Sequence, residues 1–172
     1  MEPEQEALQQ RGDFLKLYLD NCCYNRLFDD RSNIKNYLER EAVLIIMQKA
    51  FDHDLEIIGS DILEIEISKI KDIYKRNNIE DVYHALITDS VKTVSEIVQR
   101  AVQIRSISNI RSFDSLHLAS AEIHADVLLT TDMKFLKNCH RLSLGILVKN
   151  PVEFVMEVFG YDEPDYENHE NE

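Results

Sequence analysis

The sequence predicts an α/β fold, a three-layer α/β/α sandwich with a central, mainly parallel sheet. Short apolar segments of strand type alternate with longer helical segments along the chain, which is the order that βαβ units require. The 172 residues are 44% hydrophobic, which is enough for one domain with a full core. Glycine and proline are few, with four and three residues, so the bulk of the chain has a globular composition.

The first half of the chain contains two expected strands and three expected helices. Residues 15–20 alternate apolar with other side chains and stop at an acid, so they form the first strand. A long helix is expected over 32–53, with Ser32 as its N-cap. Residues 55–60 are β-branched and contain a bounding glycine, which predicts the second strand. Two further helices are expected over 61–75 and 79–87.

The second half repeats this alternation. Thr93 and Glu96 have the spacing of a capping box and predict a helix that continues to about residue 105. Another helix is expected around Asp114, followed by a strand over 126–130, a helical turn over 132–138 and a strand over 144–149. Pro151 then opens a terminal helix, because proline at the first helical position loses no hydrogen bond.

The charge distribution defines the expected domain organisation. A net charge of −13 argues at first against a nucleic-acid binder. However, the two ends, 1–13 and 161–172, carry nine of these thirteen charges, and residues 14–160 carry only −4. We therefore expect a flexible acidic extension over 1–13, one folded domain over 14–160 and an acidic, disordered tail over 161–172.

The cysteines and the apolar runs indicate where the protein works. Cys22, Cys23 and Cys139 do not make a disulfide framework, and no CxxC spacing suggests a zinc site. The sequence shows no signal-peptide pattern and no apolar run near the ~18 residues that a membrane span needs. The expected location is the cytoplasm, without membrane association.

Four acids stand at positions that demand an explanation. Asp20 and Asp132 follow expected strands, Asp114 begins an expected helix, and Glu66 shares the apolar face of its helix with Ile62. Each acid also has an ordinary interpretation, because aspartates cap helices and a glutamate at the edge of an apolar face reaches water. Strand ends and helix starts meet along one edge of an α/β sheet, so we expect the acids to gather there.

Gathered carboxylates without basic partners predict a bound cation. Oxygen ligands suit Mg²⁺ or Mn²⁺, and such an ion can activate a water and neutralise a phosphate. Thr130 lies two residues before Asp132, so both side chains point to the same side if the strand persists. The neighbouring acid Glu64 remains an alternative to Glu66. The natural reaction for this chemistry is metal-assisted hydrolysis of a phosphodiester.

These motifs resemble the PIN-domain family of metal-dependent ribonucleases, especially its bacterial toxin-type members. The resemblance covers residues 15–158 and rests on YLDN at 18–21, SDILEIE at 60–66, FDSLHLA at 113–119 and LTTDMKFL at 129–136. It implies that Asp20, Glu66, Asp114 and Asp132 are the catalytic and metal-binding acids, with Thr130 and Asn21 in support. It also implies hydrolysis of RNA, a homodimer, and a cognate protein antitoxin that reaches into the active site.

Two departures and several secondary residues accompany the resemblance. Cys22 stands where many members have Asn or Ser, and the acidic ends are unusual for a chain that holds RNA. His117 lies one helical turn beyond Asp114, within possible reach of a phosphate, although a packed or surface histidine is the default interpretation. Arg26 and Arg111 lie near the acids and are candidates for the RNA backbone, with solvated arginine as the default.

Two other classes of function compete with the nuclease. A non-catalytic PIN-like module would bind RNA or protein with little turnover. A phosphoacceptor signalling domain would also place acids at strand ends, but it needs paired acids after the first strand. Here Asp20 is followed by Asn21, which favours the endoribonuclease of a type II toxin–antitoxin pair.

Overall fold

The computed structural model describes residues 14–160, and the segments 1–13 and 161–172, for which an extension and a tail are predicted, lie outside the described residues. The described part contains a five-stranded sheet in which every pairing is parallel, with strand order β3-β2-β1-β4-β5. The strands are β1 (Leu15–Leu19), β2 (Leu55–Ser60), β3 (Ile87–Val91), β4 (Val127–Leu129) and β5 (Leu147–Lys149). The predicted α/β class with a parallel sheet is confirmed.

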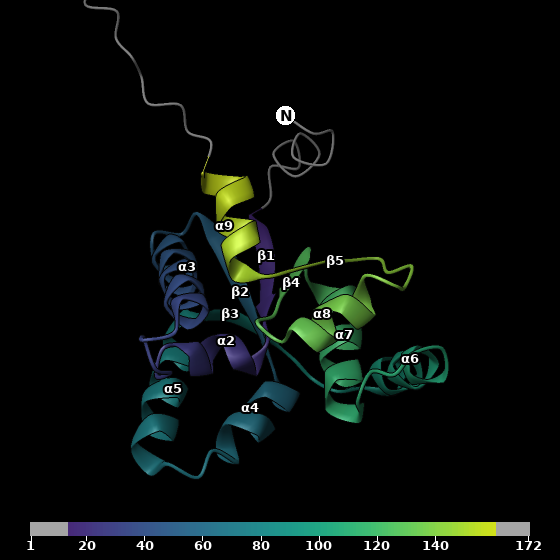
Figure 1. The fold of residues 1–172 in the computed structure, drawn as a ribbon. Helices are drawn as coiled ribbons and strands as arrows, with labels where there is room; N and C mark the ends of the chain where they lie inside the picture. The colour runs from purple at the N-terminus through teal and green to yellow at the C-terminus, as the bar shows by residue number, and fades with distance from the viewer. Residues whose placement is uncertain (1–13, 161–172) are drawn as a thin grey trace, which may run out of the picture.

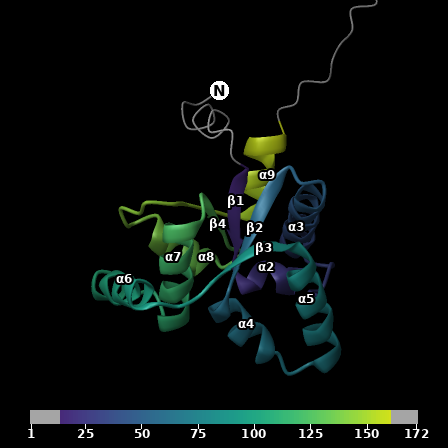
Figure 2. The same ribbon diagram turned by 180° about the vertical axis from the view of Figure 1, so that it is seen from behind.

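Helices connect all the strands of this sheet. They are α2 (Asn21–Arg26), α3 (Ile34–Phe51), α4 (Asp61–Ser68), α5 (Ile73–Leu86), α6 (Ser95–Ser106), α7 (Ser112–His124), α8 (Met133–Cys139) and α9 (Pro151–Phe159). Helices α3 and α5 cover one side of the sheet and α6, α7 and α8 the other, as the two opposite views show (Figures 1 and 2). No helix of residues 14–160 is both long enough and apolar enough to cross a membrane.

The core lies on both faces of the central strands. Leu17 and Leu19 of β1, Ile57 of β2 and Leu128 of β4 are completely buried. Parallel strands that are covered on both faces read as nearly continuous apolar runs, which is why these segments were recognisable in the sequence. Burial of each such side chain contributes roughly 1.5–3 kcal/mol to folding.

The topology brings three polar segments to one edge of the sheet. Asp20 follows β1, Ser60 ends β2, and Thr130 follows β4. Because the strands are parallel, their carboxyl ends lie at the same edge, where open α/β sheets bind their ligands. The strand order places β1 between β2 and β4, so Asp20 lies at the centre of that edge.

The structure differs from the predicted elements in several places, and the last strand, predicted from residue 144, begins only at Leu147. Strand β3 was missed, because its sequence ITDSV places Asp89 and Ser90 in a partly exposed edge strand. The predicted helix 61–75 instead ends at Ser68, and α5 starts anew at Ile73, because the Asp72 carboxylate accepts a hydrogen bond from the Lys75 N–H. The short helix α2 was missed as well, and β4 ends at Leu129 rather than at Thr130.

Two predicted helix caps are wrong. Asn33, not Ser32, caps α3, and its side chain accepts hydrogen bonds from two backbone N–H groups of the first turn. The predicted capping box at Thr93 does not form, because the Thr93 N–H and hydroxyl both donate to the Asp61 carboxylate, at 2.9 and 2.7 Å. Helix α6 consequently begins at Ser95. At the starts of α3 and α6, polar side chains form hydrogen bonds other than those of the expected caps.

Gly59 is predicted to be intolerant of a side chain. A Cβ atom at Gly59 would lie 2.9 Å from Tyr83 Cζ and closer still to the Tyr83 hydroxyl, which is buried and bonded to Ser60. Gly59→Ala is therefore expected to lower the free energy of unfolding by about 1–3 kcal/mol through overpacking.

Thermal or urea denaturation followed by circular dichroism measures this effect. Gly145→Ala is the matched control, because its Cβ would lie at an ordinary 3.6 Å from Glu122. Equal stability of the two variants would contradict the packing described for Tyr83.

Candidate metal centre

The four acids singled out in the sequence line one cleft. This cleft has a volume of about 240 Å³, and its lining includes Asp20, Glu66, Asp114 and Asp132. The four residues come from separate segments: the end of β1, helix α4, the first turn of α7 and the start of α8. The structure thus places these four side chains around one cleft.

Asp20 is the most buried of the four acids, with 6% of its surface exposed. It occupies the N-cap position of α2 but makes no side-chain capping bond, so the ordinary interpretation as a helix cap does not hold. Its Oδ2 accepts hydrogen bonds from the Thr130 hydroxyl at 2.8 Å and the Cys22 thiol at 3.2 Å. These two bonds orient the carboxylate without neutralising its charge.

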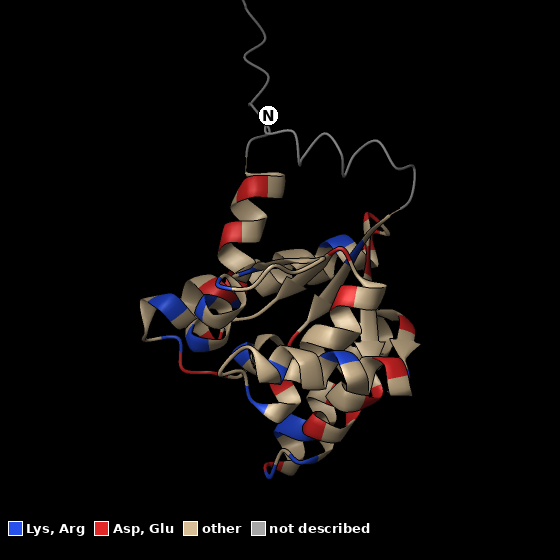
Figure 3. Ribbon diagram, turned by 90° about the vertical axis from the view of Figure 1, so that its right-hand side faces the viewer, with Lys and Arg blue, Asp and Glu red and all other residues tan. Residues whose placement is uncertain are grey.

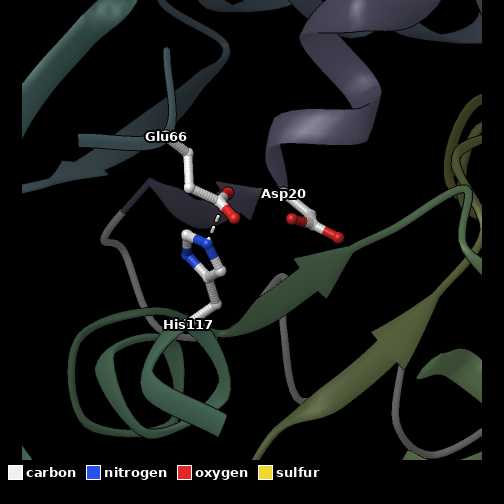
Figure 4. A group of neighbouring side chains, drawn as sticks. All are labelled: Asp20, Glu66 and His117. Atoms are coloured by element: carbon white, nitrogen blue, oxygen red, sulfur yellow. Dashed lines mark hydrogen bonds and ion pairs between the residues drawn. The ribbon is translucent and has the colours of Figure 1, made fainter. Parts of the chain in front are cut away.

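Glu66 lies next to Asp20 and is bonded to His117. Figure 4 shows the three side chains converging from the end of β1, α4 and α7. The Glu66 Oε2 atom is 2.8 Å from His117 Nε2, and one ligand atom from each of the three residues lies within 4.8 Å of the others. Glu64, the alternative acid on the same helix, is not among the residues that line the cleft.

His117 is completely buried, so the default interpretation as a packed histidine is correct as far as burial goes. Burial alone lowers the pKa of His117, but the hydrogen bond to Glu66 and the charges of the nearby acids outweigh it and raise that pKa above its ordinary value. In the sequence, only the spacing of His117 from Asp114 indicated that His117 could belong to the site. The contact with Glu66, 51 residues away, is tertiary and was missed.

Asp114 and Asp132 are joined by Arg111. The guanidinium lies 2.9 Å from Asp114 Oδ2 and 3.3 Å from Asp132 Oδ2, while 72% of the Arg111 side chain remains exposed. Burial raises the pKa of Asp114, and the bond from Arg111 offsets part of that rise. Asp132 also caps α8, since its Oδ1 accepts from two backbone N–H groups.

The supporting residues fall into two groups. Thr130 is fully buried, donates to Asp20 and accepts from the Asp132 N–H at 3.1 Å, so it connects two of the acids. Asn21 lines the cleft, and its buried Oδ1 has no hydrogen-bond partner among residues 14–160. Arg26 also lines the cleft but is not a solvated arginine, because it forms ion pairs with Asp29 and Glu39.

The donor set fits a hard divalent cation. All four acids offer carboxylate oxygens, the ligands that Mg²⁺ and Mn²⁺ prefer. Among residues 14–160, neither Asp20 nor Glu66 forms an ion pair with a lysine or arginine. A buried carboxylate needs a compensating charge, and an ion in the cleft would supply it.

The fold and the cleft together define a class, an α/β protein with a carboxylate cluster at the carboxyl edge of a parallel sheet. A family model described as "PIN domain" matches residues 17–140, so the chain belongs to the PIN-domain family. This span contains all four acids, the strands β2, β3 and β4, and β1 from Leu17 onward.

Solved structures share the fold at low sequence identity. VapBC2 from Rickettsia felis, bound to a DNA fragment from its promoter, matches with a TM-score of 0.55 at 14% identity, covering 79% of this chain and 98% of that one. FitAcB from Neisseria gonorrhoeae matches with a TM-score of 0.52 at 18% identity over 78% and 97% of the two chains. FitAB bound to the IR36 DNA fragment matches with a TM-score of 0.53 at 17% identity, covering 79% of this chain and 95% of that one. A comparison with curated proteins found no match.

Arg111 is predicted to compete with a cation for Asp114 and Asp132. Arg111→Ala is expected to tighten Mn²⁺ binding by up to about fivefold, because exposed ion pairs contribute at most about 1 kcal/mol. Isothermal titration of the purified chain with Mn²⁺ measures the change.

Arg105→Ala removes the same charge from the exposed face of α6 and serves as the control for long-range electrostatics. Unchanged or weaker Mn²⁺ binding in Arg111→Ala would contradict the competition.

Proposed function

We propose that this chain is a divalent-metal-dependent endoribonuclease that hydrolyses RNA phosphodiester bonds in the cytoplasm, as the toxin of a type II toxin–antitoxin pair. The observation that carries the proposal is the convergence of Asp20, Glu66, Asp114 and Asp132 on one cleft from four separate segments. Membership of the PIN-domain family supports the same activity. In this proposal the four acids hold Mg²⁺ or Mn²⁺.

The proposed chemistry divides between the ion and the chain. When bound, the ion supplies an activated water and a positive charge for the phosphate. Asp20 is the buried anchor, held by Thr130 and Cys22 through Oδ2. Asp132 uses Oδ1 to cap α8, which leaves Oδ2 for the cleft. These hydrogen bonds fix the carboxylates before the ion arrives, so little ordering remains to be done on binding.

Arg111 is the proposed contact for the RNA backbone. Its side chain is 72% exposed although it pairs with Asp114 and Asp132, whereas Arg26 is only 15% exposed and is held by Asp29 and the buried Glu39. An anionic substrate needs such a cation, because the cleft is otherwise acidic. In the view of Figure 3, basic residues stand among acidic ones over the helices rather than forming one basic face. Affinity for RNA is therefore proposed to arise locally at the cleft.

A second protein chain is part of the proposal. The resemblance to toxin-type members implies a protein antitoxin and a homodimer. Three exposed apolar side chains spaced four residues apart offer a surface for such contacts: Val94 at the N-cap of α6, and Val98 and Val102 within α6. Their exposed fractions are 52%, 45% and 58%.

The proposed acids are predicted to be essential for RNA cleavage. Asp20→Asn and Asp114→Asn are each expected to reduce the cleavage rate by about 100-fold or more, because each removes a charged metal ligand. The assay uses the purified full chain, Mn²⁺ and a fluorescent single-stranded RNA. Glu64→Gln is the matched control and should retain activity, since Glu64 does not line the cleft.

Two results would contradict the proposal. Cleavage by Asp20→Asn and Asp114→Asn at the parental rate would place the activity elsewhere. Binding of RNA by the parent without turnover in Mn²⁺ would instead favour a non-catalytic PIN-like module.

A further inference from the structure

His117 contacts the acidic cluster from the protein interior. It is completely buried and is not among the residues that line the cleft. Both ring nitrogens already have partners: Nε2 lies 2.8 Å from Glu66 Oε2, and Nδ1 lies 2.7 Å from the Tyr18 hydroxyl. A histidine with both nitrogens engaged and no access to the cleft is placed to hold a neighbour rather than to bind an ion.

The chain of hydrogen bonds continues into the core. The Tyr18 hydroxyl lies 2.6 Å from Ser60 Oγ, which also accepts the Leu63 N–H at 3.1 Å and thereby caps α4. Ser60 can donate its own proton to Tyr18, and Tyr18 can donate to His117 Nδ1. The remaining proton on Nε2 then points at Glu66. In this arrangement every donor has an acceptor, as buried polar groups require.

The same hydrogen bonds join the segments that carry three of the acids. Tyr18 lies two residues before Asp20 on β1, Ser60 caps the helix that carries Glu66, and His117 lies three residues after Asp114 on α7. This series of hydrogen bonds therefore connects α4 to α7 across the end of β1. A displacement of Tyr18, Ser60 or His117 would shift the carboxylates.

Glu66 has a particular need for such support. It lies near the end of the eight-residue helix α4, and its long side chain is 24% exposed. The nearby Asp20 carboxylate repels it, since ligand atoms of the two lie within 4.8 Å. The hydrogen bond from His117 offsets this repulsion and restricts the rotamers of the Glu66 side chain.

We propose that His117 is the positioning residue that holds the Glu66 carboxylate in the metal site, with Tyr18 and Ser60 fixing the proton on His117 Nε2. The inference rests on the metal site of the proposed function. Histidine commonly plays this part by directing one ring nitrogen at a carboxylate while the other is fixed by a second partner. His117 acts here through Glu66 and is not itself a ligand.

The test is a double-mutant cycle read out by Mn²⁺ affinity. Mn²⁺ binding to the full chain is measured by electron paramagnetic resonance for the parent, His117→Leu, Glu66→Gln and the double variant. His117→Leu is expected to weaken Mn²⁺ binding by about tenfold in the parent, the lower range for lost outer-shell partners. In the Glu66→Gln background the same change is expected to have no further effect, because the carboxylate that His117 positions is no longer there to bind the ion.

Two conservative variants make the test independent of folding. His117→Gln keeps an N–H donor near the position of Nε2 and should bind Mn²⁺ more tightly than His117→Leu. Tyr18→Phe keeps the ring and removes only the hydroxyl, so it should weaken binding in the parent and not in the Glu66→Gln background. If circular dichroism shows that His117→Leu does not fold, the Tyr18→Phe cycle decides.

The outcomes separate this inference from the proposed function. Equal losses of Mn²⁺ affinity in both backgrounds would overturn the positioning role, because a ligand or a purely structural residue acts without Glu66. Equal Mn²⁺ binding by all variants would overturn it as well. A parent that binds Mn²⁺ with the predicted cycle but cleaves no RNA would support the positioning role and contradict the nuclease.

Discussion

The burial of the Asp20 carboxylate at the end of the central strand is the constraint on which the site depends. Parallel pairing on both sides of β1 leaves Asp20 almost without water, with 6% of its surface exposed. Hydrogen bonds from Thr130 and Cys22 satisfy one oxygen, but they cannot replace a countercharge. Glu66, Asp114 and Asp132 share the cleft with Asp20, and Arg111 pairs with Asp114 and Asp132, so no ion pair among the described residues relieves the charge of Asp20. The free-energy cost of burying the charged Asp20 carboxylate therefore falls at a place where a divalent ion can offset it.

The structure meets this constraint by giving several polar residues two tasks. Ser60 caps α4 and is hydrogen-bonded to the Tyr18 hydroxyl. Thr130 donates to Asp20 and accepts from the Asp132 backbone N–H, and Asp132 caps α8 and pairs with Arg111. Each residue thus joins an element boundary to the cluster. The residues that end strands and cap helices also orient the carboxylates, so the same residues specify the fold and the site.

The sequence predicted the features that depend on local pattern and on topology. Apolar runs identified four of the five strands, and the meeting of parallel strand ends predicted that Asp20, Glu66, Asp114 and Asp132 would share a cleft. Strand β3 was missed because Asp89 and Ser90 interrupt its apolar pattern at an exposed edge. Contacts between distant residues were also out of reach. The partner of Thr93 is Asp61, that of His117 is Glu66, and that of Arg26 is Glu39, and nothing in their local sequence indicates these pairs.

Anomalous diffraction from crystals grown with Mn²⁺ shows directly whether the carboxylate cluster binds a divalent cation. We expect an anomalous peak between Asp20 and its acidic neighbours, with carboxylate oxygens about 2.0–2.6 Å from the ion, the range for hard divalent cations. His117 should lie outside that coordination sphere, still bonded to Glu66. A peak elsewhere on the molecule, or no peak at the cluster in saturating Mn²⁺, would show that these carboxylates do not form a metal site.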